Sequence, residues 1–159
     1  MRVYVCGPMR RQPAFGFPPF AEATEALRAL GHDVFSPAER DAALGFDPVG
    51  MTGHEDLSLV GFDLRDALAS NLAWIARNAD VLCVLPGWEH SAGARAEIAL
   101  AAALDLLVGY LYDFHADSLI PAAALLHPVA HPSGETPRSG TCSRRCPVRT
   151  LTRRPVRST

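Results

Sequence analysis

The sequence contains no lysine, so all 15 of its basic residues are arginines. Cysteines are also few, 4 in 159 residues, and they lack the spacing of a disulfide-stapled secreted domain. Long apolar runs are missing as well, because the longest one, Ile98–Tyr112, is interrupted by Asp105 and is too short to span a bilayer. No signal peptide is recognisable before Val3. We therefore expect a cytoplasmic globular protein without a membrane partner.

Sequence motifs typical of metal-binding sites are also rare in this chain. Cys142 and Cys146 are spaced as C-x3-C without companion histidines, which is a weak indication of a metal site. His54, Glu55 and Asp56 are adjacent, so their three side chains cannot all point toward one ion. We expect neither a metal nor any other cofactor.

The apolar residues of the chain are numerous enough to form the hydrophobic core of one domain. A chain of 159 residues with 48% hydrophobic composition can bury a core of ordinary size. The hydrophobic pattern stops after Leu126, and residues 127–159 are rich in Pro, Ser and Thr, carry seven arginines against one glutamate, and contain no aromatic residue. We predict a domain at residues 1–126 and a disordered basic tail at 127–159, with no nucleic acid as partner.

The central stretch of the domain reads as a strand, a turn and a helix. Asp80–Leu85 is almost entirely apolar, as in a parallel strand buried on both faces, and a Pro-Gly turn ends it. Ser91 is the predicted N-cap of the next helix, and Gly93 leaves the first turn bare. Such a helix start at the carboxyl end of a parallel strand is a common anion site. Glu97 follows one and a half turns later, where it faces either solvent or a ligand.

Two further strands place loops at the same edge of the sheet. Residues 2–6 and 33–36 are short apolar strands, followed by Gly7-Pro8 and by residues 37–41. Ser36 and Glu39 are candidate contacts of a ligand there. With helices predicted at 19–30 and 63–78 and a last strand at 106–112, the fold class is α/β. We predict a flavodoxin/Rossmann-like three-layer sandwich with a parallel sheet of four to five strands.

The helix at residues 63–78 carries one polar residue beside its apolar stripe. Leu64, Leu68, Leu72 and Ile75 recur at helical spacing and are predicted to be buried. At about 100° per residue, Asn71 falls on the inward edge of that stripe. A polar side chain in this position needs a partner or a function.

The strings LPGWEHSAGARAE and VYVCGPMR resemble the nucleoside 2-deoxyribosyltransferase-like superfamily over about residues 2–108. The most similar branch consists of small phage and bacterial proteins of unassigned function that are related to nucleotide N-glycosidases. The resemblance implies that the first loop lines the sugar and phosphate pocket through Gly7, Pro8, Met9 and Arg10.

The resemblance also implies roles for residues elsewhere in the chain. Glu97 matches the family's nucleophile, Ser91 a phosphate-binding serine, and Tyr4 a residue that holds the pentose. Gly93 lets backbone N–H groups approach a phosphate. Asn71 stands where relatives have an acid that assists departure of the base, so the acid is replaced by its amide. Trp88 either stacks on the base or anchors the Pro-Gly turn in the core.

Three other parts of the chain are open to more than one interpretation. The phenylalanines of the loop at residues 12–19 and its flank, Phe15, Phe17 and Phe20, either stack on a base or fill the core. Residues 42–61 form a lid or a long loop. Glu89 and His90 offer an alternative proton donor.

The function expected from the resemblance is cleavage or transfer of the N-glycosidic bond of a nucleoside or nucleoside 5′-monophosphate, in a homodimer. One alternative is a catalytically weakened nucleotide-binding module, which the amide at Asn71 favours. Another is a phosphoribohydrolase of the cytokinin-releasing type, although its Pro-Gly-Gly-x-Gly-Thr signature is absent from this chain.

Overall fold

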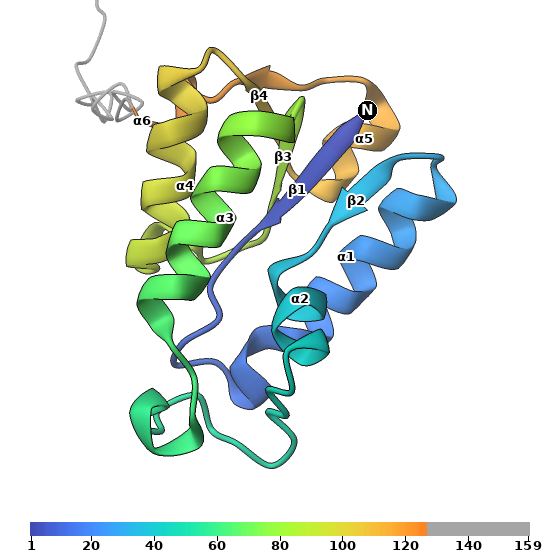
Figure 1. Ribbon diagram of the computed structural model, residues 1–159. Helices are drawn as coiled ribbons and strands as arrows, with labels where there is room; N and C mark the ends of the chain where they lie inside the picture. Colours follow the sequence, from blue (N-terminus) through green and yellow to red (C-terminus); the bar gives the residue numbers. More distant parts are fainter. Residues whose placement is uncertain (127–159) are drawn as a thin grey trace, which may run out of the picture. The chain divides into compact units, whose positions relative to one another are not determined.

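A five-stranded sheet forms the middle layer of the computed structural model, which describes residues 1–126 (Figure 1). The strands are β1 (Arg2–Cys6), β2 (Asp33–Phe35), β3 (Val81–Val84), β4 (Leu107–Gly109) and β5 (Ile120–Pro121). Their order is β2-β1-β3-β4-β5, and β1 to β4 are parallel. This is the order of flavodoxin-like sheets, in which the topological switch point lies between β1 and β3. The predicted fold class is confirmed.

The prediction of a purely parallel sheet is wrong for β5, which runs antiparallel to β4. A parallel neighbour needs a crossover connection of about a dozen residues or more. Helix α5 (Leu111–Ala116) follows β4 almost directly, and only Asp117–Leu119 separate it from β5. The chain therefore turns back beside β4, and the sheet is mixed.

The strand predicted at residues 106–112 ends early, at Gly109. The Asp113 carboxylate accepts a hydrogen bond from the backbone N–H of Tyr110 at 2.7 Å, which caps the first turn of α5. A Cβ at position 109 would lie 2.9 Å from the Cβ of Asp113, so a glycine is needed where the chain returns so closely. A local cap thus overrides the apolar pattern that predicted a longer strand.

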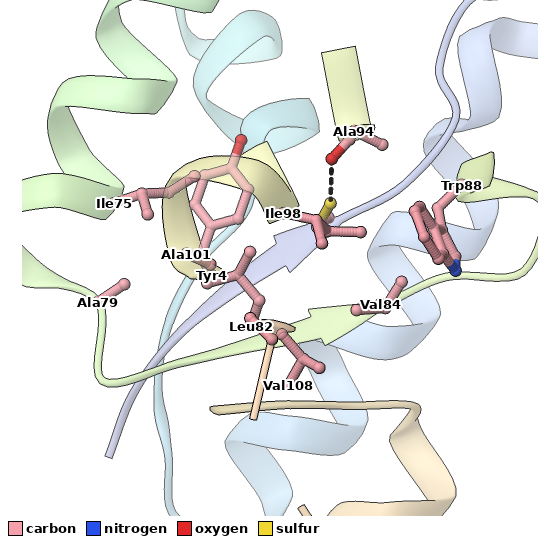
Figure 2. Close-up of a cluster of buried hydrophobic side chains, with 12 residues drawn as sticks. Tyr4, Ile75, Ala79, Leu82, Val84, Trp88, Ala94, Ile98, Ala101 and Val108 are labelled. Atoms are coloured by element: carbon pink, nitrogen blue, oxygen red, sulfur yellow. Dashed lines mark hydrogen bonds between the residues drawn. The ribbon is translucent and has the colours of Figure 1, made fainter. Parts of the chain in front are cut away.

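Helices cover both faces of the sheet (Figure 1). One face carries α3 (Leu64–Asn78), α4 (Ala92–Ala103) and α6 (Ala123–Leu126), and the other carries α1 (Phe17–Ala29) and α5. The residues of β1 alternate between the two cores, with Tyr4 and Cys6 on the α3–α4 side and Val3 and Val5 on the α1 side. Figure 2 shows the α3–α4 core, which includes Ile98.

The buried stripe of α3 differs from the predicted one. The residues buried on this helix are Ala67, Asn71 and Ile75. Leu64 is 43% exposed, and Leu68 and Leu72 are only half-buried. The predicted and the observed stripe have the same helical period, so the sequence pattern alone does not distinguish them. Packing against α4 fixes the rotation of the helix about its axis, and this rotation determines which stripe is buried. Asn71 therefore lies at the centre of the inward face and not at its edge.

Helix α2 (Pro37–Ala43) occupies residues where only a loop was expected, and the connection from α2 to α3 includes a 3₁₀ helix at Leu57–Val60. We call residues 44–62 the lid segment. Its backbone is tied to the first loop, because Arg11 N–H donates to Gly53 O at 2.8 Å and Ala14 N–H donates to Met51 O at 2.9 Å. A Cβ at Gly53 would collide with the backbone of Gln12. The lid segment is thus closely packed on the first loop.

No helix among residues 1–126 is both long and apolar enough to cross a membrane. Cys142 and Cys146 and the predicted basic tail lie outside the described residues.

Candidate active site

Tyr4 and Glu97 are joined by a buried hydrogen bond under helices α3 and α4. The Tyr4 hydroxyl donates to Glu97 Oε1 at 2.7 Å. Tyr4 is fully buried in β1, and Glu97, in the second turn of α4, is 6% exposed. Helix α4 follows β3, so the two residues come from the two sides of the β1–β3 switch point. This is the position at which open α/β sheets bind their ligands.

Burial raises the pKa of Glu97 to about 7, because water no longer solvates its charged form. The side chains of Tyr4, Cys6 and Asn71 act in the opposite direction as hydrogen-bonding neighbours. Burial, and then the charge of Glu97, raise the pKa of the Tyr4 phenol well above its usual value, so Tyr4 stays a hydrogen-bond donor. Near neutral pH a substantial fraction of Glu97 is ionised, as a carboxylate nucleophile requires.

Asn71 approaches this pair from α3. It is 7% exposed, and its Oδ1 has no hydrogen-bond partner among residues 1–126. A buried polar atom without a partner destabilises a fold. The amide oxygen is therefore available to accept a hydrogen bond from a ligand. An amide has no acidic proton to give, so Asn71 can position a ligand but cannot act as a general acid.

An aromatic wall that the sequence did not reveal completes the interior. Phe35 stacks on Tyr4, with ring centroids 5.7 Å apart and planes inclined by 14°. Trp74 stacks on Phe35 at 4.6 Å and 24°. Phe35 is paired with Tyr4 in the β1–β2 register, and Trp74 lies one turn after Asn71. Flat aromatic faces of this kind bind sugars and bases by stacking.

Cys6 is another neighbour of Glu97 that the sequence did not identify. Its thiol donates to the carbonyl oxygen of Ala94 at 3.6 Å, as the dashed line in Figure 2 marks. Burial, and then the charge of Glu97, raise the pKa of this thiol well above its usual value. The strand period could have found it, because residues 4 and 6 of one strand share a face. The raised pKa makes Cys6 a packing residue and not a nucleophile.

The first loop is packed against the Pro-Gly turn. A Cβ at Gly7 would lie 2.7 Å from the Cβ of Leu85, and Gly87, at φ 84°, would place a Cβ 3.6 Å from Cγ of Pro8. Met9 packs on the α1 core, and Arg10 is exposed. The two turns therefore form one continuous rim at the carboxyl edge of the sheet.

The start of α4 has the predicted cap. Ser91 Oγ accepts a hydrogen bond from the backbone N–H of Ala94 at 3.3 Å, so Ser91 is confirmed as the N-cap. The nearest heavy atom to a Cβ at Gly93 would be 3.9 Å away, so the backbone there is open.

Trp88 is 7% exposed, and its indole N–H donates to the Tyr110 hydroxyl at 3.3 Å. Of its two expected roles, this placement matches the packing anchor.

Two hollows adjoin at the carboxyl edge. The larger, about 780 Å³, lies between the lid segment and the start of α3 and includes Arg10 and Arg65 in its lining. The smaller, about 220 Å³, lies between α2, the lid segment and α3. Both include Gly61–Asp63, so they share a wall. Glu97 and Ser91 line neither of these two hollows, so Arg10 lies in a hollow to which Ser91 does not contribute. Tyr4, Asn71 and Glu97, in contrast, are direct neighbours.

The other polar candidates lie in different settings. Ser36 is buried, and within residues 1–126 its Oγ has no hydrogen-bond partner. Glu39 is exposed and pairs with Arg28 at 2.7 Å on the outer surface. Among the described residues, no three His, Cys, Asp or Glu side chains are grouped so that they could hold a metal ion.

The phenylalanines beside the first loop are packed against protein. Phe20 belongs to the α1 core, which matches the core-filling interpretation. Phe15 contacts Phe46 edge-on at 5.2 Å, and Phe17 lies 5.9 Å from the same ring. Phe46 in turn contacts Phe62 at 4.8 Å, so an aromatic cluster joins the first loop to the lid segment.

Comparison with known proteins gives one match. Residues 1–110 match the family described as Domain of unknown function (DUF4406). The match covers more than half of the chain, so the chain belongs to this family. No curated protein and no solved structure matches the chain.

Proposed function

We propose that the protein cleaves the N-glycosidic bond of a nucleoside or nucleoside 5′-monophosphate, with Glu97 as the nucleophile. The observation that carries this proposal is the buried Tyr4–Glu97 hydrogen bond beside the unpaired Asn71 oxygen at the switch point of the sheet. The reaction class comes from the resemblance of the sequence to the nucleoside 2-deoxyribosyltransferase-like superfamily, in which Glu97 matches the nucleophile.

The chemistry follows the logic of a retaining glycosidase. The Tyr4 hydroxyl holds Oε1 of Glu97, and the other carboxylate oxygen attacks the anomeric carbon of the sugar. The bond from that carbon to the base breaks, and its electron pair leaves with the base nitrogen, which takes a proton from water. A water molecule then attacks the same carbon, gives its proton to the hydroxide left by the first proton transfer, and releases the Glu97 carboxylate. A second base in place of water would give transfer.

The proposal extends to the rest of the ligand and to assembly. Ser91 and Gly93 at the start of α4 are the expected contacts of a 5′-phosphate, because helix starts favour anions, whereas Arg10 lines a separate hollow beside the lid segment. Leu64, Leu68 and Leu72 form an apolar row that is exposed or half-buried on α3. This row supports a homodimer, which sedimentation analysis would test.

Incubation with a panel of ribo- and deoxyribonucleosides and their monophosphates, followed by assay of free base, tests the proposed function. We expect base release by the wild type and a loss of at least about 10⁴-fold in kcat/KM in Glu97→Ala, as for other enzymes without their nucleophile. Glu25→Ala, which removes an exposed glutamate on α1, is the matched control. Release by Glu97→Ala at the wild-type rate would contradict the proposal.

The nucleotide-binding module remains the second candidate, and the amide of Asn71 supports it. Binding without catalysis needs hydrogen-bond acceptors and stacking surfaces, which Asn71, Phe35 and Trp74 provide, but no acid. Retention of nucleotides without release of base in the same panel would favour this candidate.

A further inference from the structure

Asp41 is a second buried carboxyl group, and the proposed reaction does not use it. It lies on α2 and is 1% exposed. Arg40 Nη1 donates to Asp41 Oδ1 at 3.0 Å, and Nη2 of the same guanidinium donates to Asp66 at 3.0 Å. Within residues 1–126 no hydrogen bond is made to Asp41 Oδ2. One carboxylate oxygen is thus fixed by Arg40, and the other is left as a free acceptor.

This carboxylate lines the smaller hollow together with aromatic rings. Phe46 and Phe62 also line the hollow, and their ring centroids are 4.8 Å apart. Aromatic faces bind a nucleobase by stacking, whatever its identity. A carboxylate accepts hydrogen bonds but donates none. The hollow therefore combines an unselective aromatic surface with a buried carboxylate that distinguishes hydrogen-bond donors from acceptors.

The hollow is connected to Glu97 through α3 and Tyr4. Ala67, which lines the hollow, lies one turn before Asn71 on the buried stripe of α3. The charge of Asp41 also contributes, as the smallest of several causes, to the raised pKa of the Tyr4 phenol, so the two groups lie within electrostatic reach of each other. A base in the hollow would thus contact α3 one helical turn before Asn71.

We infer that the hollow lined by Asp41, Phe46 and Phe62 is the base subsite, and that Asp41 selects bases that carry an exocyclic amino group. The inference rests on the proposed function, from which it takes the class of ligand, a nucleoside or nucleoside monophosphate. An amino group donates a hydrogen bond to the free Oδ2, whereas an oxo group at the same ring position places two acceptors against each other. Asp63 and Asp66 also line this hollow, and with Asp41 they outnumber its single arginine, Arg40, which disfavours a phosphate there.

The ionisation of Asp41 suits this role. Burial raises its pKa to about 6, against the opposing effect of Arg40. At about pH 7.5 the side chain is therefore mostly ionised and acts as an acceptor. Hydrogen bonds to charged groups are stronger than those between neutral groups, and loss of one changes affinity by roughly 10- to 150-fold.

Equilibrium binding to a variant without the nucleophile tests the inference separately from catalysis. Glu97→Gln is titrated at pH 7.5 by calorimetry with adenosine against inosine monophosphate and with cytidine against uridine monophosphate. We expect the amino form of each pair to bind roughly 10- to 150-fold more tightly. Asp41→Asn in the same background should bring the two affinities of each pair close together, because an amide can donate as well as accept.

Two control variants separate selection from packing. Asp47→Asn removes an exposed carboxylate of the lid segment that lines neither hollow, and it should preserve the amino preference. Phe62→Leu should weaken the binding of all four nucleotides alike. If melting shows that Asp41→Asn is unfolded, Asp41→Ser replaces it.

Equal affinities within each pair, an unchanged ratio in the Asp41 variants, or no binding of any of the four nucleotides would overturn the inference. Amino-selective binding without release of base by the wild type would instead contradict the proposed function and leave the base subsite standing.

Discussion

The two faces of the sheet bury very different side chains although the same strand supplies both. On the α1 face, β1 contributes Val3 and Val5 to an apolar core. On the α3–α4 face it contributes Tyr4, which contacts the buried Glu97. A carboxyl group with its pKa raised to about 7 destabilises the fold at neutral pH. The fold would be more stable without this group, so the polar side of the sheet points to function and the apolar side to stability.

Asn71→Asp should produce the largest effect, because it would add the missing acid to the polar face. General acid assistance is typically worth about 10²- to 10⁴-fold, so base release should rise within that range. The pKa values of the new carboxyl and of Glu97 should both be raised, because two like charges in one site disfavour joint ionisation. The measurement is kcat/KM against pH for both forms of the protein. Release no faster than that of the wild type at any pH between about 5 and 8 would show that Asn71 does not occupy the position of an acid.

Glu97→Gln should stabilise the domain, and the gain should depend on pH. The pKa of Glu97 is about 7 in the folded state against 4.5 as its ordinary value, so the folded state binds more protons between these values. The stability of the wild type therefore falls as pH rises from about 4.5 to 7. Above pH 7 the variant should be more stable by about 3 kcal/mol, and below about pH 4 the difference should vanish.

Urea unfolding of the two proteins at pH 4 and pH 8 measures this gain, and Glu25→Gln on the exposed side of α1 is the control. An equal difference at both pH values would mean that the burial of Glu97 does not govern its ionisation.

Thr24→Val gives the smallest effect and tests the apolar face. Thr24 is buried in α1, and its Oγ1 has no hydrogen-bond partner within the described residues, as is also true of Asn71 Oδ1. Replacing an unpaired hydroxyl with a methyl group should stabilise the fold by about 1 kcal/mol and leave base release unchanged. Thermal unfolding and the base assay are the two measurements. A fall in base release would extend the functional site to the α1 face and break the contrast between the faces.

The sequence predicts much of this arrangement because its strongest patterns are local. The apolar strand before Pro86-Gly87, the N-cap at Ser91 and the helix at residues 63–78 depend on neighbours in the chain, and the structure contains all three. The position of Glu97 one and a half turns into α4 follows from the same cap.

What the sequence does not predict depends on contacts between distant residues. The rotation of α3 places Asn71 at the centre of the buried stripe, although Leu64, Leu68 and Leu72 have the stronger apolar pattern. The aromatic wall requires the β1–β2 register and the placement of α3 together. The burial of Asp41 depends on the elements that pack around α2, which no periodicity in the chain indicates.

The most direct test of the account is to trap the covalent intermediate on Glu97. A nucleotide with fluorine at the sugar 2-position destabilises the oxocarbenium-like transition states of both steps, and the glycosyl-enzyme then accumulates if its hydrolysis becomes the slower step. Mass spectrometry of the digested protein should find the added sugar phosphate on the peptide that contains Glu97, with one equivalent of base released, and no addition in Glu97→Gln. Release of base with the adduct on another residue, or with an unmodified Glu97 peptide throughout turnover, would contradict the assignment of Glu97 as the nucleophile.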